Sequence, residues 1–258
     1  MPSLFFTDHG HGEPVIFLHG YCETHEIWKS IESYLQKNYR VICPDLPGFG
    51  DSEMLQIGFS LREVADSIKE LLDHLEISNC VIIGHSLGGY VALAYAEKYP
   101  ETLKGFGLFH SSAFEDSAEK KKIRNKLIEF IGENGVEPFV KTFIPSLFNQ
   151  EKLDKNIAAL EAVKELAYRT TVDTVIEYAR AMRDRPERLF VLKNFKKPIL
   201  FIIGDKDGSV PFEKSLKQSQ IPEKAVVHIL KDTGHMGMFE EEEESQIHVK
   251  EFLDLCFI

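Results

Sequence analysis

Short apolar segments alternate with longer segments of helical periodicity in the first part of the chain. Residues 15–18, 40–43, 79–83 and 103–109 are apolar runs with the length of buried strands. Between them, apolar residues recur at helical spacing over residues 24–36, 60–75 and 87–98. Buried strands that alternate with amphipathic helices are typical of a parallel sheet covered on both faces. The pattern therefore predicts an α/β fold.

The pattern changes after Ser112, and no convincing strand follows for about 85 residues. The helical spacing in this region is interrupted by Pro138 and Pro145, which predicts several separate helices. Two expected strands then follow, at 199–203 and 226–230, and a closing helix is expected at 239–256.

This order predicts one α/β domain interrupted by a helical insertion. We expect residues 1–112 and 193–258 to form the core domain and residues 113–192 to form a helical cap. An insertion between two strands would lie over the carboxyl edge of the sheet, where ligands bind in open α/β folds.

Composition and charge narrow the range of partners. The chain has 258 residues, of which 43% are hydrophobic and 28% charged, and its formal net charge is -11. Nucleic-acid binding needs a basic face, so we expect no nucleic-acid partner. No apolar run is long enough to cross a bilayer, and the N-terminus has no signal-peptide pattern, so we expect no membrane partner. The four cysteines form no zinc-site or C-x-x-C pattern, which favours free thiols and a cytoplasmic location.

The strongest chemical signal is the segment Gly84-His85-Ser86-Leu87-Gly88, which matches G-x-S-x-G between an expected strand and an expected helix. A tight strand-to-helix turn needs small residues on both sides, and it exposes the central serine hydroxyl at the top of the sheet. No G-x-G-x-x-G or P-loop lysine is present, which disfavours a nucleotide-binding turn. Ser86 is therefore the candidate nucleophile.

A serine nucleophile needs a base and a carboxylate that orients the base. His235 lies between the last expected strand and the last helix, in a loop at the same sheet edge as Ser86. Other histidines, such as His110 directly after a strand, have simpler interpretations as packed or surface residues. Asp205 and Asp207 both follow the strand at 199–203, and position alone does not choose between them.

The tetrahedral intermediate of acyl transfer needs hydrogen-bond donors for its oxyanion. The backbone N–H of Leu87, directly after the nucleophile, is the first candidate. The second is the backbone N–H of Tyr21, in the loop after His19-Gly20.

Taken together, these segments resemble the α/β-hydrolase family, in the subgroup with a helical cap and a serine nucleophile. The matching segments are Phe17-Leu18-His19-Gly20, Pro44-Asp45-Leu46-Pro47-Gly48-Phe49-Gly50-Asp51-Ser52, Gly84-His85-Ser86-Leu87-Gly88-Gly89, Gly204-Asp205-Lys206-Asp207 and Gly234-His235. They span most of the chain outside the expected cap.

The resemblance implies a mostly parallel central sheet with helices on both faces and a helical cap inserted after the sixth strand. In the family pattern the catalytic acid is the third residue after the strand-ending glycine, which selects Asp207. Some members place this acid after the preceding strand, but His110-Ser111-Ser112 carries no carboxylate at that point. The family position of the second oxyanion donor agrees with Tyr21.

The resemblance covers esterases, lactonases, thioesterases, C–C bond hydrolases and cofactor-free haloperoxidases. A serine at position 86 disfavours members that use an aspartate nucleophile. We expect hydrolysis of a small-molecule ester through an acyl-enzyme, with no metal and no organic cofactor. The alternatives are a lactonase or C–C hydrolase with the same triad, and a ligand receptor with little turnover. The sequence is compatible with a homo-oligomer and does not give the oligomeric state.

The cap is expected to shape the substrate pocket. The candidate lining residues are Phe139, Phe143, Phe148, Tyr168 and Met182, although each could equally belong to the core of the cap. The cluster Arg180, Arg183 and Arg185 could bind an acidic substrate, but a solvated helix face is the favoured interpretation.

Overall fold

The computed structural model of the protein describes residues 3–258. One seven-stranded sheet has the order β1-β3-β2-β4-β5-β6-β7. Its strands are β1 (Phe6–Gly10), β2 (Pro14–Leu18), β3 (Arg40–Pro44), β4 (Cys80–His85), β5 (Leu103–Phe109), β6 (Ile199–Gly204) and β7 (Ala225–Leu230). β1 pairs antiparallel with β3, and the other strand pairs among these residues are parallel. The expected mostly parallel sheet is confirmed.

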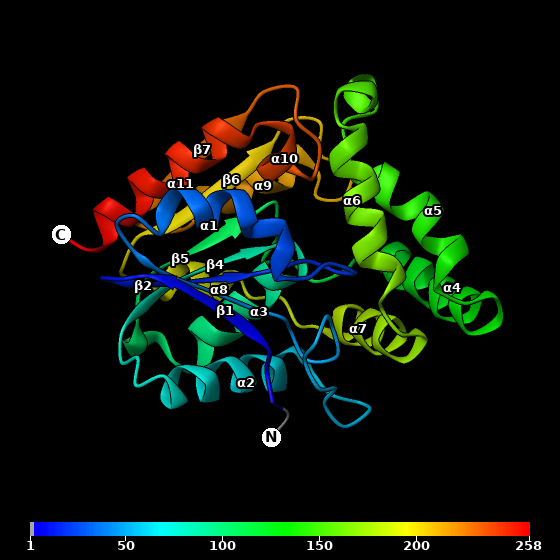
Figure 1. Ribbon diagram of the computed structural model, residues 1–258, viewed down its shortest axis with the longest axis horizontal. Helices are drawn as coiled ribbons and strands as arrows, with labels where there is room; N and C mark the ends of the chain where they lie inside the picture. The colour runs from blue at the N-terminus through cyan, green and yellow to red at the C-terminus, as the bar shows by residue number, and fades with distance from the viewer. Residues whose placement is uncertain (1–2) are drawn as a thin grey trace.

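Helices cover both faces of the sheet (Figure 1). α1 (Lys29–Leu35) and α11 (Glu242–Cys256) pack together on one face, and α2 (Leu61–His74) and α3 (Leu87–Lys98) pack together on the other. Every residue of β4 is buried, because this central strand has neighbours on both edges and helices on both faces. The shorter elements are η1 (His25–Trp28), η2 (Pro100–Thr102), α8 (Leu189–Asn194), α9 (Phe212–Ser219) and α10 (Gly237–Glu240).

The segment between β5 and β6 is helical, as its spacing predicted. It contains α4 (Ala118–Asn134), α5 (Val136–Leu147), η3 (Gln150–Lys155), α6 (Ile157–Tyr168) and α7 (Val172–Asp184). Figure 1 shows α4 to α7 gathered beside one end of the sheet. The division into a core (1–112 and 193–258) and a cap (113–192) stays a prediction.

The place of the insertion in the strand order differs from the expectation. The helical segment follows the fifth strand of this chain, β5, and not the sixth. The number six came from the resemblance to the family, whereas five strands, β1 to β5, precede the insertion within residues 3–258. The closing helix also differs, since it is broken at Glu241, whose φ of -137° and ψ of 64° are not helical.

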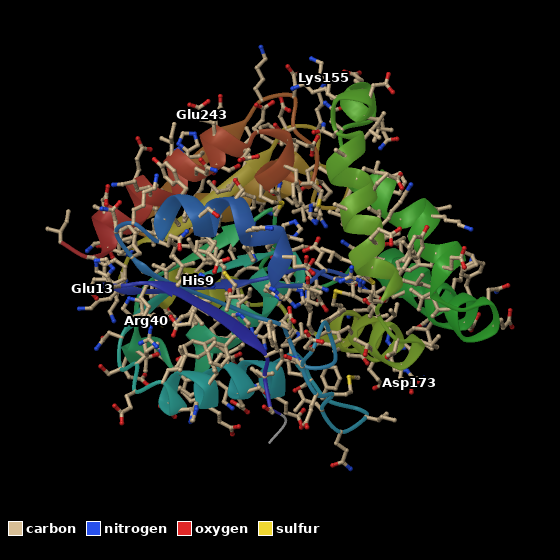
Figure 2. All side chains as sticks on the ribbon, viewed as in Figure 1. His9, Glu13, Arg40, Lys155, Asp173 and Glu243 are labelled. Carbon is tan, nitrogen blue, oxygen red and sulfur yellow. The ribbon has the colours of Figure 1, made fainter. Side chains whose placement is uncertain are left out.

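The acidic residues on the two sides of the break at Glu241 lie in different environments. Glu240 turns inward and accepts hydrogen bonds from the backbone N–H groups of Asn149 (2.8 Å) and Met236 (3.2 Å). Glu243 points into solvent from the first turn of α11, as Figure 2 shows. Negative charge at this exposed helix start suits the helix dipole.

No helix among residues 3–258 is long and apolar enough to cross a membrane. The cytoplasmic location and the absence of nucleic-acid and membrane partners stay predictions.

Candidate active site

Ser86 lies at a sharp turn between β4 and α3. Its backbone has φ 49° and ψ -109°, a conformation that non-glycine residues rarely adopt. The turn is possible because β4 and α3 cross in close contact, and each has a glycine at the contact, Gly84 in β4 and Gly88 in α3. A Cβ at Gly84 would lie 2.2 Å from the carbonyl carbon of Gly88, and a Cβ at Gly88 would lie 2.2 Å from the carbonyl oxygen of Leu18.

Hydrogen bonds from β5 and the residues after it hold this turn in place. The Ser86 N–H donates to the carbonyl oxygen of Phe109 at 3.0 Å. The hydroxyl of Ser111 donates to the carbonyl oxygen of Ser86 at 2.6 Å. Hydrogen bonds therefore hold both peptide groups that flank the Cα of the strained residue.

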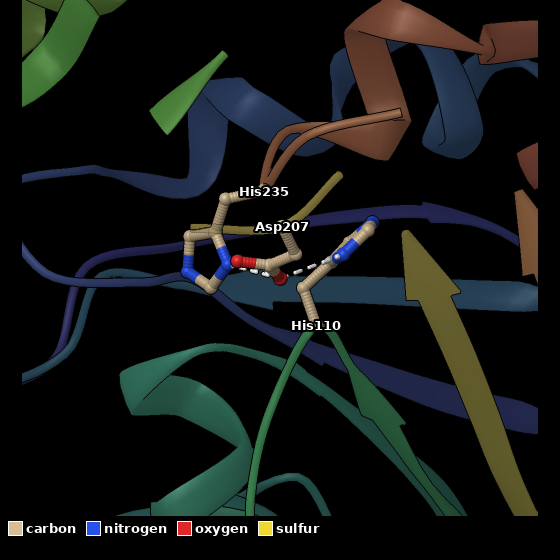
Figure 3. Close-up of side chains that lie close together, drawn as sticks. All are labelled: His110, Asp207 and His235. Carbon is tan, nitrogen blue, oxygen red and sulfur yellow. Dashed lines mark hydrogen bonds and ion pairs between the residues drawn. The ribbon is translucent and has the colours of Figure 1, made fainter. Parts of the chain in front are cut away.

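Asp207 and His235 are joined by a hydrogen bond (Figure 3). His235 Nδ1 lies 2.7 Å from Asp207 Oδ2, and both side chains are almost completely buried. An ionised carboxylate is only an acceptor, so Nδ1 carries the hydrogen and Nε2 presents a lone pair. Asp205, the alternative acid, instead accepts from the backbone N–H of Thr233 at 3.3 Å.

His110 is a third member of this cluster, and the sequence analysis missed its role. Its Nδ1 donates to the same Asp207 Oδ2 at 3.2 Å, as Figure 3 shows. The other oxygen, Oδ1, accepts from the N–H groups of Ser209 (2.8 Å) and Val210 (2.9 Å). Four donors therefore surround one carboxylate.

These contacts set the charge states around Asp207. Burial alone would raise the pKa of Asp207, but the charge interaction with His235 and the hydrogen bonds from His110 and His235 outweigh it and lower the pKa. Burial lowers the pKa of His110 to about 4, and Asp207 compensates only in part. His110 is thus a neutral donor at pH 7.

The His110, Asp207 and His235 atoms lie close enough together to be tested as metal ligands. Two ligands of a tetrahedral zinc ion, each about 2.0–2.2 Å from the metal, lie more than about 3 Å apart. The Asp207–His235 distance of 2.7 Å is shorter than this and fits a direct hydrogen bond.

A second group of possible metal ligands consists of His228, His248 and Glu251. Its two imidazole rings are stacked, with their centroids 3.8 Å apart and an angle of 18° between the ring planes. Ring lone pairs lie in the ring plane, so stacked rings do not aim at one ion. Neither group fits a metal.

Ser86 and His235 line one cavity of about 310 Å³. Within residues 3–258 no hydrogen bond joins Ser86 to His235. In structures without substrate, catalytic hydrogen bonds are often long and tighten only in the complex.

Three of the five aromatic and methionine candidates line this cavity, namely Phe139, Phe143 and Met182. Phe148 and Tyr168 do not. Phe148 is buried after the end of α5, where its backbone packs against Gly234, and Tyr168 ends α6 and packs against the hydrophobic core.

The three arginines near the end of α7 do not line the cavity either. Arg180 pairs with Glu177, Arg183 with Asp184 at 2.6 Å, and Arg185 with Asp116 at 2.7 Å. Two other cations, Lys120 and Arg124 from α4, line the cavity instead. The sequence analysis did not consider these two residues.

The two expected oxyanion donors have free N–H groups. Among residues 3–258, the backbone N–H of Tyr21 and that of Leu87 donate to no other group. Leu87 is the first residue of α3, where a backbone N–H has no partner within the helix. Tyr21 is anchored through its phenol, which donates to the carbonyl oxygen of Val175 at 2.6 Å.

Comparisons with known proteins agree with this fold. The family described as alpha/beta hydrolase fold matches residues 13–242. Lipase 3 of Moraxella sp. (strain TA144) is 27% identical over 247 residues, which cover 94% of this chain and 78% of that protein. Lipase 1 of Psychrobacter immobilis is 27% identical over 260 residues, which cover 97% and 80%.

Among solved structures, a thermophilic esterase from Thermogutta terrifontis has a TM-score of 0.94 and 28% identity, covering 99% of this chain and 94% of that one. The enol-lactonase from Burkholderia xenovorans LB400 has a TM-score of 0.90 at 19% identity, covering 97% and 96%, and shows the fold alone. The chain belongs to the α/β-hydrolase fold family and is an enzyme of that family.

The crossing of β4 and α3 gives a first prediction. We expect Gly88→Ala to lower the free energy of unfolding by at least about 3 kcal/mol, because its Cβ would overlap the Leu18 carbonyl. Gly132→Ala in α4 is the control, since its nearest neighbour is 4.0 Å away, and it should be neutral or stabilising by up to about 1 kcal/mol. Urea unfolding measures both, and equal stability of the two variants would contradict the tight crossing.

The neutral state of His110 gives a second prediction. Below its unfolded pKa of 6.5 the unfolded chain binds a proton at this residue, whereas the folded chain does not until about pH 4. Stability should therefore fall as the pH decreases through this window, by about 3 kcal/mol from His110 alone. His110→Asn keeps a donor and tolerates the φ of 48°, so its unfolding free energy should fall less steeply with acid. Parallel curves of unfolding free energy against pH for the two proteins would show that His110 does not carry this dependence.

Proposed function

We propose that this enzyme hydrolyses small carboxylic esters through an acyl-enzyme formed on Ser86, with His235 as general base and Asp207 as the acid that orients it. The observation that carries the proposal is the Asp207–His235 hydrogen bond of 2.7 Å beside a cavity that Ser86 and His235 both line. A carboxylate, an imidazole and a hydroxyl that faces a cavity are the groups that acyl transfer needs.

In the first half of the reaction, Ser86 Oγ attacks the ester carbonyl while His235 Nε2 accepts the hydroxyl proton. The tautomer fixed by Asp207 leaves this nitrogen free to accept it. The imidazolium that forms is stabilised by the carboxylate, and it returns the proton to the departing alcohol. Water then enters, gives a proton to His235 Nε2 and attacks the acyl carbon. When the bond from the acyl carbon to Ser86 Oγ breaks, the imidazolium returns the proton to Oγ and the carboxylic acid is released.

The oxyanion of each tetrahedral intermediate needs two donors, and we assign these roles to the N–H groups of Tyr21 and Leu87. Both N–H groups are unoccupied by other acceptors within residues 3–258. Leu87 also begins α3, whose dipole favours negative charge at that end.

The size of the cavity supports small esters. Its volume of about 310 Å³ lies at the lower end of the range of ligand cavities, about 300–1,000 Å³. Phe139, Phe143 and Met182 give one wall an apolar surface for an acyl or alcohol group. The names of the lipase and esterase relatives support ester hydrolysis in preference to a lactone or C–C substrate.

The test is turnover of p-nitrophenyl acetate, butyrate and octanoate by the wild type and by Ser86→Ala. We expect multiple turnovers that favour the shorter acyl chains, and a loss of at least about 10³-fold in kcat for Ser86→Ala. Ser209→Ala changes another serine of the same cavity and should keep most of the activity. Turnover that survives in Ser86→Ala would remove Ser86 as nucleophile, and inactivity of the wild type on every ester would direct the search to lactones, C–C substrates or a bound ligand.

A further inference from the structure

A second buried carboxylate, Glu23, lies in the wall of the same cavity. Its Oε2 accepts a hydrogen bond from the backbone N–H of Gly20 at 2.6 Å and lies 2.9 Å from His85 Nδ1. The other ring nitrogen of His85, Nε2, lies 2.9 Å from the carbonyl oxygen of His235. Glu23 is 1% exposed and His85 is 0% exposed.

The hydrogen-bond partners of His85 determine its protonation state. A carboxylate and a backbone carbonyl are both acceptors, so each ring nitrogen of His85 must carry a hydrogen. Glu23 Oε2 already accepts the Gly20 hydrogen, which favours the proton on the imidazole and not on the carboxylate. Burial alone would lower the pKa of His85, but the charge of Glu23 and the hydrogen bonds to Glu23 and His235 outweigh it and raise the pKa.

The pair is placed where its charge balance affects acyl transfer. Glu23 is two residues after Tyr21, one of the two proposed oxyanion donors, and faces the cavity. An uncompensated carboxylate there would repel the negative charge that develops on the substrate oxygen. The pair also joins three segments of the site: the loop after β2, the turn at Ser86 and the loop that carries His235.

We propose that Glu23 and His85 are positioning residues of the proposed reaction, in which the imidazolium of His85 cancels the charge of Glu23 beside the oxyanion and links the three loops. The inference rests on the ester hydrolysis proposed above. It predicts that the two side chains are coupled: the loss of His85 alone is harmful chiefly because Glu23 remains charged.

A double-mutant cycle tests this coupling. We expect His85→Gln to lower kcat for p-nitrophenyl butyrate by about 10- to 100-fold with little change in KM. Glu23→Gln in the His85→Gln background should restore at least half of the lost factor on a logarithmic scale. A double variant as slow as His85→Gln, or slower, would overturn the charge-balance role, because a purely steric role predicts additive losses.

A second measurement does not depend on catalytic activity. Nitrogen-15 spectra of histidine-labelled Ser86→Ala protein at pH 7.5 should show a histidine signal with both ring nitrogens protonated that disappears in Ser86→Ala/His85→Gln and in Ser86→Ala/Glu23→Gln. A neutral His85 in Ser86→Ala would overturn the inference even if the wild type hydrolyses esters. Failure of the wild type on esters with a protonated His85 would instead count against the proposed reaction.

A separate observation concerns the face that α4 turns toward the cavity. Lys120, Ile123, Arg124 and Leu127 are spaced at i, i+3, i+4 and i+7, and all four line the cavity. Lys120 Nζ donates to the carbonyl oxygen of Ser209 at 3.3 Å and has no carboxylate partner among residues 3–258.

The cavity-lining residues of α4 include two cations, Lys120 and Arg124, and no anion. Arg124 pairs with Asp116, which also binds Arg185 behind the cavity wall, whereas Lys120 has no carboxylate partner within residues 3–258. Burial alone would raise the pKa of Tyr90, another lining residue, but the charges of Arg185, Lys120 and Arg124 outweigh it and lower the pKa. A positive region of this kind in a chain of net charge -11 is a local feature, not a consequence of composition.

The structure assigns to Lys120 and Arg124 a subsite for a negatively charged group of the substrate. Given the proposed function, the substrate class is an ester that carries a carboxylate a few bonds from the scissile carbonyl. The apolar wall then holds the remaining part of the molecule.

Two esters of equal shape test the subsite. In ethyl 4-methylpentanoate an isopropyl group replaces the carboxylate of monoethyl succinate. We expect Lys120→Met to reduce kcat/KM for monoethyl succinate by about 10-fold, mostly through KM, and to change it for the neutral ester by less than about 2-fold. Lys121→Met, on the same helix but paired with Glu115 away from the cavity, should change neither. Equal effects of Lys120→Met on both esters would overturn the subsite.

Binding provides a readout separate from catalysis. Monoethyl succinate should raise the Tm of Ser86→Ala, and the shift should shrink in Ser86→Ala/Lys120→Met and at high salt. Absence of the shift in Ser86→Ala would overturn the subsite while leaving hydrolysis of neutral esters to stand on its own.

Discussion

The crossing of β4 and α3 at Gly84 and Gly88 is the constraint on which the site depends. Backbone atoms occupy the space of both missing Cβ atoms, so the chain reverses within a few residues and Ser86 takes a φ of 49°. This geometry sends three consecutive residues in three directions. His85 points inward to Glu23, Ser86 lines the cavity, and Leu87 begins the helix with a free N–H.

Two buried carboxylates, Asp207 and Glu23, belong to this site, and each is stabilised differently. Burying a carboxylate without partners is costly, so each has several hydrogen-bond donors. Asp207 has four, and three of them are neutral groups other than His235. It can therefore remain charged while His235 gains and loses a proton. Glu23 has one backbone donor and His85, so its charge depends much more on a cationic neighbour.

The sequence predicted the parts of this structure that local signals encode. Strand and helix periodicity indicated the sheet, and the short motif around Ser86 indicated the turn, because both depend on neighbours in the chain. The pairs His85–Glu23 and His110–Asp207 are 62 and 97 residues apart, and no local pattern brings them together. Aromatic residues of the helical segment were equally ambiguous. Phe139 and Phe148 are the same residue type in the same helical segment, and the sequence does not distinguish them. The course of α5 places Phe139 in the cavity lining, whereas Phe148 is buried outside it.

The helical segment between β5 and β6 is part of the site's geometry and does more than cover it. The carbonyl oxygen of Leu147, at the end of α5, accepts the backbone N–H of His235 at 2.6 Å. Asn149 donates its side-chain amide to the carbonyl oxygen of Asp232 and its N–H to Glu240, on both sides of the same loop. A displacement of the end of α5 would therefore shift His235 relative to Ser86. Substitutions there should act on the base as well as on the pocket, whereas Lys120 and Arg124 of α4 bring charge to the cavity wall.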